Sequence, residues 1–390
     1  MTRTDRGHPA WRRIVAVYIA VQFAEIFGVS MIYSYLPLAL EGAGVPIGEI
    51  ASLTGVAIAG LFVVGAPQVP IWLAIAELRS RRLVIVRSGL IALAALVAFA
   101  AADQAWQLVA STVALGFWLG NTGVMLATIR EVAPERARAR SIAAFSAAAP
   151  MGFALGPLVA GALIEGAGLP LAAPILVAAA LNGALIVANL VAIPDVRPTH
   201  PPQGSILSVA QRGIRQLVRI PAVRSGYLVL FFAIAGERIL RPVFPLRIAE
   251  IAIGPQIGEI AEPLSQPGIA GAVGLLVGLS ALAGAMLAPI LVTLLVRRSG
   301  APRLMVGGFL VAALSAGGML AASGLLGLAL ANTAMAAAAA LLQTTVYTWL
   351  GDEVDDRNRT AALSLSLFPL RSEEHTSELQ SLRHLVCRLL

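Results

Sequence analysis

Long apolar runs separated by short polar segments dominate the first 350 residues of the chain. Each run holds enough predominantly apolar residues, about 20, for an α-helix to cross the roughly 30 Å hydrocarbon core of a bilayer. The pattern therefore predicts an all-α membrane protein. Ten full spans are expected, at residues 14–40, 50–76, 83–101, 106–129, 141–164, 171–193, 227–251, 269–296, 304–320 and 325–350.

Several polar and proline-containing segments recur about 221 residues apart. The sequence Glu-Arg-Ala-Arg at 135–138 is matched by Asp-Arg-Asn-Arg at 356–359, and Ala-Pro at 66–67 is matched at 288–289. Such a repeat predicts two pseudo-symmetric six-helix bundles, with a substrate site near the midplane between them. We expect a first bundle at 1–193, a cytoplasmic linker at 194–225 and a second bundle at 226–370. Within the linker, 206–217 is expected to form an amphipathic helix at the membrane surface.

An eleventh apolar segment begins at 360 and stops at 370. Its 11 or so residues form only roughly 16 Å of helix, which is too short to span. The following residues, 371–390, are polar and resemble a translated sequencing adapter. We therefore expect an incomplete second bundle followed by an artefactual tail.

Composition places the chain in a membrane. Apolar residues make up 58% of it and charged residues 13%, whereas a soluble domain carries roughly a quarter of its residues charged. Its single cysteine, Cys387, excludes a disulfide framework and a cysteine metal site. No cluster of catalytic or metal-ligating side chains is recognisable, so neither an enzyme, nor a cofactor, nor a metal is expected.

The net charge of +7 does not indicate a nucleic-acid partner, because the basic residues form no patch. All 28 are arginine, and most of them gather in alternate loops, near 3–13, 79–82, 130–140, 197–224, 297–303 and 357–359. Positive residues are retained in the cytoplasm. This asymmetry predicts a multi-pass protein of the inner (plasma) membrane with a cytoplasmic N-terminus. We expect it to be a monomer in the lipid bilayer.

Glu25 is the most informative single residue, because it lies near the middle of the first span. An ionised acid there costs about 2.5–3.5 kcal/mol on insertion scales. Because a bound proton removes this cost, a carboxyl group at this depth can take up and release a proton. Glu25 is therefore our candidate for proton coupling. The alternative is a neutral acid that bonds a neighbouring helix. Gln22 lies on roughly the same face, and Tyr33 either lines the cavity or belongs to the interfacial aromatic belt.

The seventh span carries Glu237, Arg238 and Arg241. Glu237 and Arg241 are four residues apart and can pair along one helix face. Arg238 points elsewhere, and we hypothesise a proton-sensitive pair with Glu25. Alternatively, both arginines snorkel outward.

Amides recur at matching positions of the fourth and tenth spans, at Asn121 and Gln343. Trp118 and Tyr347 lie near them. These side chains either contact a substrate or bridge helices, and the aliphatic surroundings suit a lipophilic ligand. Arg87, near the end of the third span, is expected to snorkel.

The loop after the second span, Leu-Ala-Ile-Ala-Glu-Leu-Arg-Ser-Arg-Arg at 73–82, resembles the G-x-x-x-D-R-x-G-R-[RK] loop of the major facilitator superfamily. Glu77, Arg81 and Arg82 keep the acid and the final bases, while both glycines are replaced. The resemblance covers 14–370 and implies the two-bundle transporter fold. It also implies that this loop helps to lock the outward-open state. The alternative is that its arginines follow only the general rule that positive residues are retained in the cytoplasm.

The fifth span resembles a motif of the family's antiporters through Gly152, Gly156, Pro157 and Gly161, with Ala160 in place of one glycine. Small residues at a spacing of four let a neighbouring helix approach closely, and proline bends the helix. Small-residue packing alone is the alternative explanation. The fourth span lacks the arginine common in proton-coupled drug antiporters, since Thr112 occupies that position.

These features predict a secondary transporter that exchanges protons for small lipophilic compounds and exports them. Uptake of a small metabolite, possibly an anion held by Arg238 and Arg241, is the alternative. A membrane enzyme is poorly supported.

Overall fold

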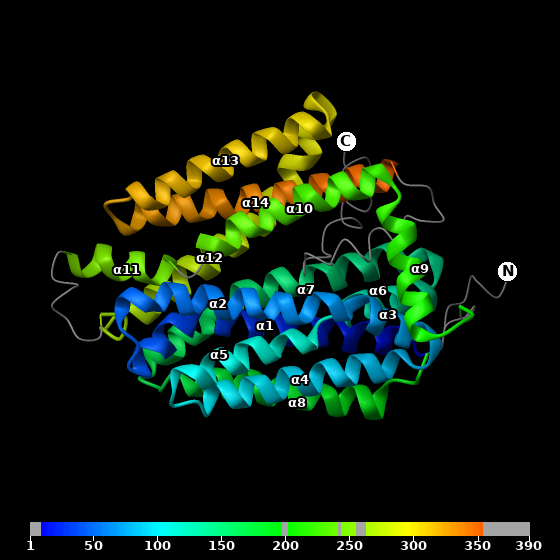
Figure 1. Ribbon diagram of the computed structural model, residues 1–390, viewed down its shortest axis with the longest axis horizontal. Coiled ribbons are helices and arrows are strands. Elements are labelled where there is room, and N and C mark those ends of the chain that lie inside the picture. The colour runs from blue at the N-terminus through cyan, green and yellow to red at the C-terminus, as the bar shows by residue number, and fades with distance from the viewer. Residues whose placement is uncertain (1–8, 197–201, 241–242, 255–262, 354–390) are drawn as a thin grey trace.

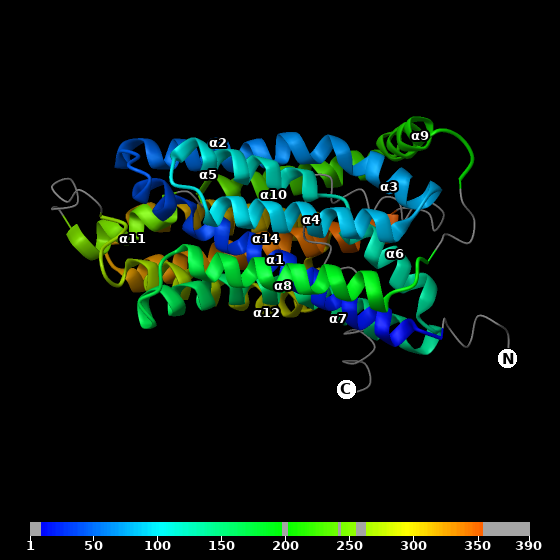
Figure 2. The same cartoon turned by 90° about the horizontal axis from the view of Figure 1, so that it is seen from below.

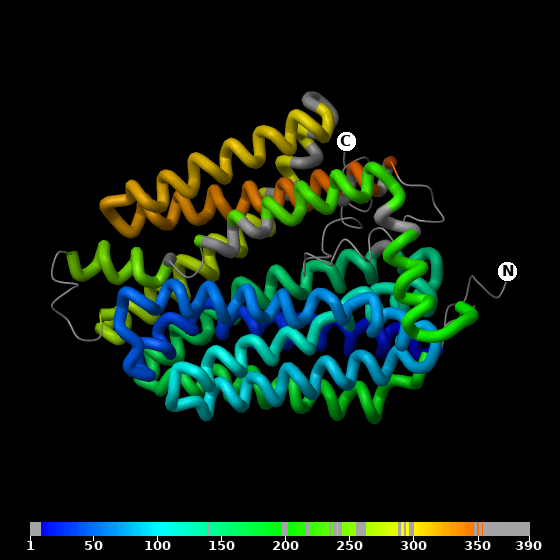
Figure 3. Tube along the Cα trace, viewed as in Figure 1, coloured from blue at the N-terminus to red at the C-terminus, as the bar shows by residue number. Residues whose placement is uncertain are grey.

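The computed structural model describes residues 9–196, 202–240, 243–254 and 263–353. Within these ranges helices and the turns that join them make up the chain, and nine helical segments are long and apolar enough to cross a membrane. Six of these precede residue 194, as the sequence predicted. The expected eleventh segment and the tail at 371–390 lie outside the described residues. Figure 3 draws the residues outside the description in grey.

The first bundle is built around α1 (Trp11–Gly42), which runs through its middle (Figure 2). The third span is α4 (Arg81–Ala100), the fifth is α7 (Glu135–Gly161) with its extension η4 (Ala162–Gly166), and the sixth is α8 (Ala172–Ala192). Local sequence sets the helix ends: the Oγ atom of Ser80 accepts the Leu83 N–H at 3.1 Å and caps α4. Pro46 and Pro134 precede α2 and α7.

Two spans of this bundle contain short 3-10 segments, and the fourth also breaks at Leu119 and Gly120. The second consists of α2 (Ile47–Gly65), η2 (Ala66–Gln68) and α3 (Val69–Leu78). The fourth consists of α5 (Ala105–Ala114), η3 (Leu115–Trp118) and α6 (Thr122–Val132). The η3 segment packs closely against the end of α2. A Cβ added to Gly116 would lie 2.2 Å from the Leu61 carbonyl oxygen, and a Cβ added to Gly65 would lie 2.5 Å from the Gly116 carbonyl oxygen.

The linker helix α9 (Ile206–Val218) is amphipathic and packs on α3. It is followed by α10 (Pro221–Leu240) and α11 (Val243–Ile253), which together occupy the expected seventh span; residues 241–242 between them are not described. The remaining helices are α12 (Ile269–Ser299), α13 (Ala301–Ala321) and α14 (Leu325–Glu353).

The two groups of helices meet mainly along α7 and α12. Figure 1 shows α12 leaving the first bundle and rising away from it toward the end of the molecule where the N-terminus lies. We call the opposite end, where α1 finishes, the Glu41 end. At the other end, α9 connects the two groups by packing on α3 and α10.

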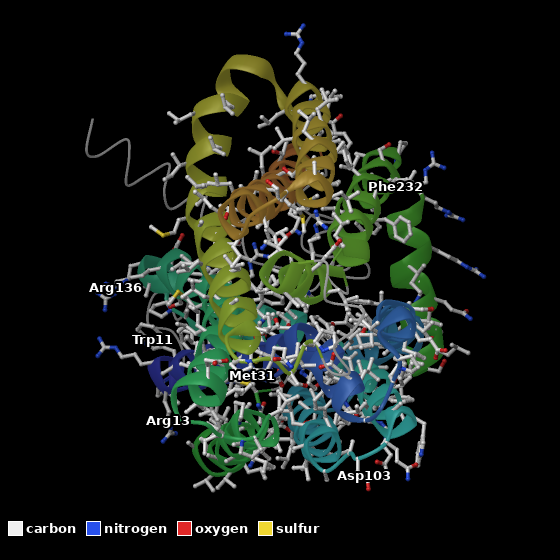
Figure 4. The ribbon with its side chains drawn as sticks, turned by 90° about the vertical axis from the view of Figure 1, so that its left-hand side faces the viewer. Trp11, Arg13, Met31, Asp103, Arg136 and Phe232 are labelled. Carbon is white, nitrogen blue, oxygen red and sulfur yellow. The ribbon has the colours of Figure 1, made fainter. Side chains whose placement is uncertain are left out.

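Apolar side chains cover the outside as well as the inside of the bundle. Figure 4 shows Met31 in the interior and Phe232 on the outer surface, where it is 61% exposed. A soluble protein would hide such surface from water, whereas here the lipid tails solvate it.

Candidate functional site

A buried carboxylate lies at the centre of the first bundle. The Glu25 side chain is 1% exposed, and the Nδ2 atom of Asn121 lies 2.8 and 2.7 Å from its two carboxylate oxygens. One helix turn earlier, the Oε1 atom of Gln22 accepts a 3.1 Å hydrogen bond from the Thr122 hydroxyl. The two pairs join α1 to the start of α6, so the predicted residues Glu25, Gln22 and Asn121 form one cluster.

The break in the fourth span places Asn121 beside Glu25. The 3-10 helix η3 ends at Trp118, and α6 begins at Thr122, directly after Asn121. Between them Gly120 has φ +113°, a backbone conformation that favours glycine. A Cβ at this position would also lie 3.2 Å from that of Trp72. The chain therefore changes direction at Gly120 and turns the next side chain toward α1.

Arg87 of α4 holds this break. Its guanidinium donates to the carbonyl oxygens of Phe117 at 2.6 Å and Leu119 at 3.0 Å. It also lies 3.9 Å from the ring centroid of Trp72, and the neighbouring Ser88 hydroxyl donates to the Trp118 carbonyl at 2.7 Å. The expectation that Arg87 snorkels was therefore wrong. The carbonyl groups released by the break need donors at membrane depth, and Arg87 and Ser88 provide them.

The fifth span packs against α1 through its glycines. A Cβ added to Gly152 would lie 2.6 Å from the Phe23 carbonyl oxygen, and one added to Gly156 would lie 2.1 Å from the Ser30 Oγ atom. Ser30 in turn donates to the Gly152 carbonyl at 3.3 Å. This close approach is what a face of small residues permits.

The other side of α7 meets α12 at the Glu41 end. A Cβ added to Gly161 would lie 3.2 Å from the Gly274 Cα atom, and one added to Gly274 would lie 2.4 Å from the Pro157 carbonyl oxygen. The hydroxyl of Tyr35 lies 3.0 Å from that same oxygen and 2.9 Å from the Ala270 carbonyl oxygen. Tyr35 thereby joins α1, α7 and α12.

Two carboxylates of the first bundle bind the segment that leads into α12. The buried Glu41 side chain accepts the Leu264 N–H and the Ser265 hydroxyl, each at 2.8 Å. The exposed Glu165 accepts the Gly268 N–H at 2.7 Å. Together with Tyr35, these contacts join the two bundles at the Glu41 end.

The basic loop after the second span forms a charge cluster within the first bundle. Arg81 is 1% exposed and makes a bidentate pair with Glu131, with both N–O distances 2.8 Å, while Glu77 lies 3.2 Å away. The cluster joins the end of α3 and the start of α4 to α6. Arg82 donates instead to the Leu190 carbonyl of α8.

Trp118, Tyr33 and Gln343 are the other predicted cavity residues whose side chains the structure describes. Trp118 is buried in the η3 segment, whereas Tyr33 packs against Phe153 with 6.5 Å between ring centroids. Gln343 is buried in the second bundle, on α14. Neither Arg241 nor the side chains of Glu237, Arg238 and Tyr347 belong to the described part, and the hypothesis of a Glu25–Arg238 pair lies there too. In the described part, no three His, Cys, Asp or Glu side chains gather as metal ligands.

From the sequence alone, Arg87, Glu131 and Glu41 were given no role in the site. The signal for Arg87 was its place as the fifth residue of the predicted span, roughly 6 Å from the start of that span, where a buried carbonyl is one of its few partners. Nothing in the sequence marks the others, since their partners are distant in the chain.

The model of the Major Facilitator Superfamily matches residues 18–247, which is more than half of the chain. The protein thus belongs to this family of membrane transporters, and it is not an enzyme. Family members move small molecules across membranes, often coupled to ions.

Two curated relatives are multidrug proteins. The chain is 31% identical over 157 residues to the multidrug resistance protein MdtG of Proteus mirabilis, an alignment that covers 40% of this chain and 39% of the relative. It is 26% identical over 136 residues to a multi-drug resistance efflux pump PmrA homolog of Lactococcus lactis, covering 35% and 34%. The matches thus span well under half of either relative's length.

Solved structures share the fold. A crystal structure of the nucleoside transporter NupG has a TM-score of 0.65 at 13% identity, covering 93% of this chain and 88% of that one. A bacterial homolog of the human lysosomal transporter Spinster has a TM-score of 0.66 at 16% identity, covering 94% and 81%. These likenesses concern the architecture alone.

Proposed function

We propose that this transporter exports small lipophilic compounds in exchange for protons, with Glu25 as the proton carrier. The observation that carries the proposal is the burial of this carboxylate, 1% exposed, in the middle of the first span. Its hydrogen-bond donor Asn121 is neutral, so the site does not depend on a tight charge pair with that residue. A carboxyl group in such surroundings exchanges a proton when water reaches it.

The direction of transport and the class of substrate rest on three supports. The partial relatives are a multidrug resistance protein and a multidrug efflux pump homolog. The fifth span resembles the antiporter motif of the family. The polar groups around Glu25 are few, which suits a substrate bound mainly through apolar contact.

Alternating access explains how the two bundles would act together. The described contacts that join them at the Glu41 end, through Tyr35, Glu41 and Glu165, support a state closed at that end. Opening at the Glu41 end, together with closure at the end where α9 lies, would expose Glu25 to the side of the membrane at the Glu41 end. From the arginine distribution we place the N-terminus in the cytoplasm and the protein, as a monomer, in the plasma membrane.

The test compares Glu25→Gln with Glu49→Gln in cells that lack their own pumps. Glu49 is an exposed acid at the start of α2 and serves as the control. Wild type and Glu49→Gln should lower the accumulation of lipophilic dyes, and Glu25→Gln should not. Proteoliposomes should show dye movement that follows an imposed proton gradient. Dye extrusion by Glu25→Gln at the wild-type rate, or net uptake by wild type, would overturn the proposal.

A further inference from the structure

Asn121 has one bonded end and one unsatisfied end. Its Nδ2 atom contacts both oxygens of Glu25, while its buried Oδ1 atom has no hydrogen-bond partner among the described residues. A buried acceptor without a partner costs free energy and calls for a physical explanation. The residue is 1% exposed, so bulk water does not supply the missing donor.

Protonation of Glu25 would supply that donor. When a proton binds one carboxylate oxygen, the group becomes neutral and gains an O–H donor, while its other oxygen remains an acceptor. A half-turn of the Asn121 amide exchanges its two ends and would then present Oδ1 to this O–H, in the place that Nδ2 occupies beside the ionised form. The amide itself neither gains nor loses a proton. One side chain can therefore satisfy both states of Glu25, provided that its backbone is held in place.

The backbone before Asn121 is held by α4. Arg87 bonds the carbonyl oxygens of Phe117 and Leu119, and Ser88 bonds that of Trp118, so the last three residues before Gly120 are all fixed. The Arg87 and Ser88 side chains also bond each other at 2.8 Å. Only the Gly120 backbone separates this clamp from Asn121.

We propose that Arg87 is a positioning residue, which clamps the broken fourth span so that the Asn121 amide can serve Glu25 in both of its protonation states. The inference rests on the proposed role of Glu25 as proton carrier. It assigns to the third span a part in proton coupling that acts through backbone geometry. A guanidinium suits this task because its donors form a planar fork that reaches several carbonyl groups at once, which the compact ammonium of lysine does not do.

Several described groups near Glu25 have identified partners. Arg87 interacts electrostatically with Glu25, Gln22 and Thr122 bond each other, and Asn182 of α8 donates to the Ala24 carbonyl oxygen at 3.2 Å. The other described charged side chains on helices that pack against α1 lie near the helix ends or on the short helix α11: Glu49, Arg81, Arg82, Arg130, Glu131, Glu135, Arg136, Arg138, Arg140, Arg247 and Glu250.

The experiment measures the protonation of Glu25 directly, by infrared difference spectroscopy of the full chain in lipid nanodiscs as the pH is varied. Glu25→Gln identifies the carboxyl band. Arg87→Lys keeps the positive charge but loses the fork, and Asn121→Ala removes the amide. If Arg87 acts by position, each variant should move the pH profile of the band toward alkaline pH by about one unit, because the charge-assisted hydrogen bonds to the ionised form are stronger than the bond to the neutral form and are the larger loss. The double variant should move it no further than Asn121→Ala alone.

An Arg87→Lys profile identical to that of wild type would overturn the proposal, as would shifts that simply add in the double variant. Leu90→Met, an exposed position one turn along α4, is the control that should not shift the profile. If Arg87→Lys does not fold, Ser88→Ala removes one member of the clamp and should shift the profile in the same direction by a few tenths of a unit. A folded Ser88→Ala without a shift would also overturn it.

The outcome is separable from that of the proposed function. The spectroscopic profile needs neither substrate nor flux, so it can show the coupling even if the protein does not export. Conversely, dye extrusion that survives Glu25→Gln would end the proton-carrier role and leave the measured coupling of Arg87 to Asn121 standing.

Discussion

The hydroxyl oxygen of Tyr35 lies 2.9 Å from the carbonyl oxygen of Ala270, 235 residues later in the chain. It also lies 3.0 Å from the Pro157 carbonyl oxygen, so its single hydrogen is shared between the two acceptors or alternates between them. One buried hydroxyl thereby joins α1 and α7 of the first bundle to α12 of the second.

Tyr35→Phe should favour the state that is open at the Glu41 end. The substitution keeps the ring and removes only the hydroxyl, which should weaken the closed state by about 1 kcal/mol. The ratio of open to closed molecules should then rise about fivefold. Spin labels at Asp103 and Ala321, in a Cys387→Ser background, would report the distance between the bundles at this end. An unchanged distance distribution would show that the hydroxyl does not stabilise closure.

Glu41→Gln should open the same end more strongly. Glu41 is 4% exposed and accepts two hydrogen bonds, from Leu264 and Ser265. Glutamine keeps one acceptor oxygen but turns an NH2 group toward one of the two donors, at a cost of about 2 kcal/mol. Glu165→Gln should have a smaller effect, since that side chain is exposed and accepts one bond. The same spin-label distances measure both variants, and equal effects would contradict the role assigned to burial.

Hydropathy was sufficient to predict the first six spans, because a membrane helix must be about 20 residues long and apolar throughout. It did not predict the 3-10 turn of the second span or the break in the fourth. A count of apolar residues ignores backbone direction, and the available signals were Gly65, Pro67, Gly116 and Gly120. The seventh span is described as α10 and α11, and whether it is continuous depends on residues 241–242, which lie outside the described residues.

The candidate site was predictable as a set of residues but not as a set of contacts. Glu25 stands out because an acid in hydrocarbon is costly, and Gln22 follows from helical spacing. Asn121 was singled out because it matches Gln343 in the repeat, but its contact with Glu25 joins positions 96 residues apart. Sequence spacing gives no information on such a pair. Arg87 was misinterpreted because snorkelling depends on which partners are nearer, and those partners exist only after the fourth span has broken.

Glu131→Gln should destabilise the first bundle. The Arg81 guanidinium is buried and makes its two shortest ion-pair contacts with this carboxylate. Loss of the bidentate pair leaves a buried charge partly unpaired, which should lower the free energy of unfolding by about 2 kcal/mol. Thermal unfolding in detergent would show this as a lower midpoint. Glu135→Gln, an exposed acid four residues later at the start of α7, should leave the midpoint unchanged, and equal midpoints for the two variants would contradict the assignment.

Gly156→Ala should separate α1 from α7. The added methyl group would lie 2.1 Å from the Ser30 Oγ atom and 2.5 Å from the Phe27 carbonyl oxygen. Ser30 can change rotamer, but the Phe27 carbonyl belongs to the α1 backbone, so the two helices must move apart. Overpacking of this kind costs about 1–3 kcal/mol. Gly317→Ala is the matched control, because no atom lies within 4 Å of the added methyl group at that position on α13. There alanine should be neutral or slightly stabilising, since it favours helix more than glycine does. Thermal unfolding should therefore give a lower midpoint for Gly156→Ala and an unchanged or slightly higher midpoint for Gly317→Ala. A Gly156→Ala variant as stable as wild type would mean that the antiporter-like motif of the fifth span does not set its contact with α1.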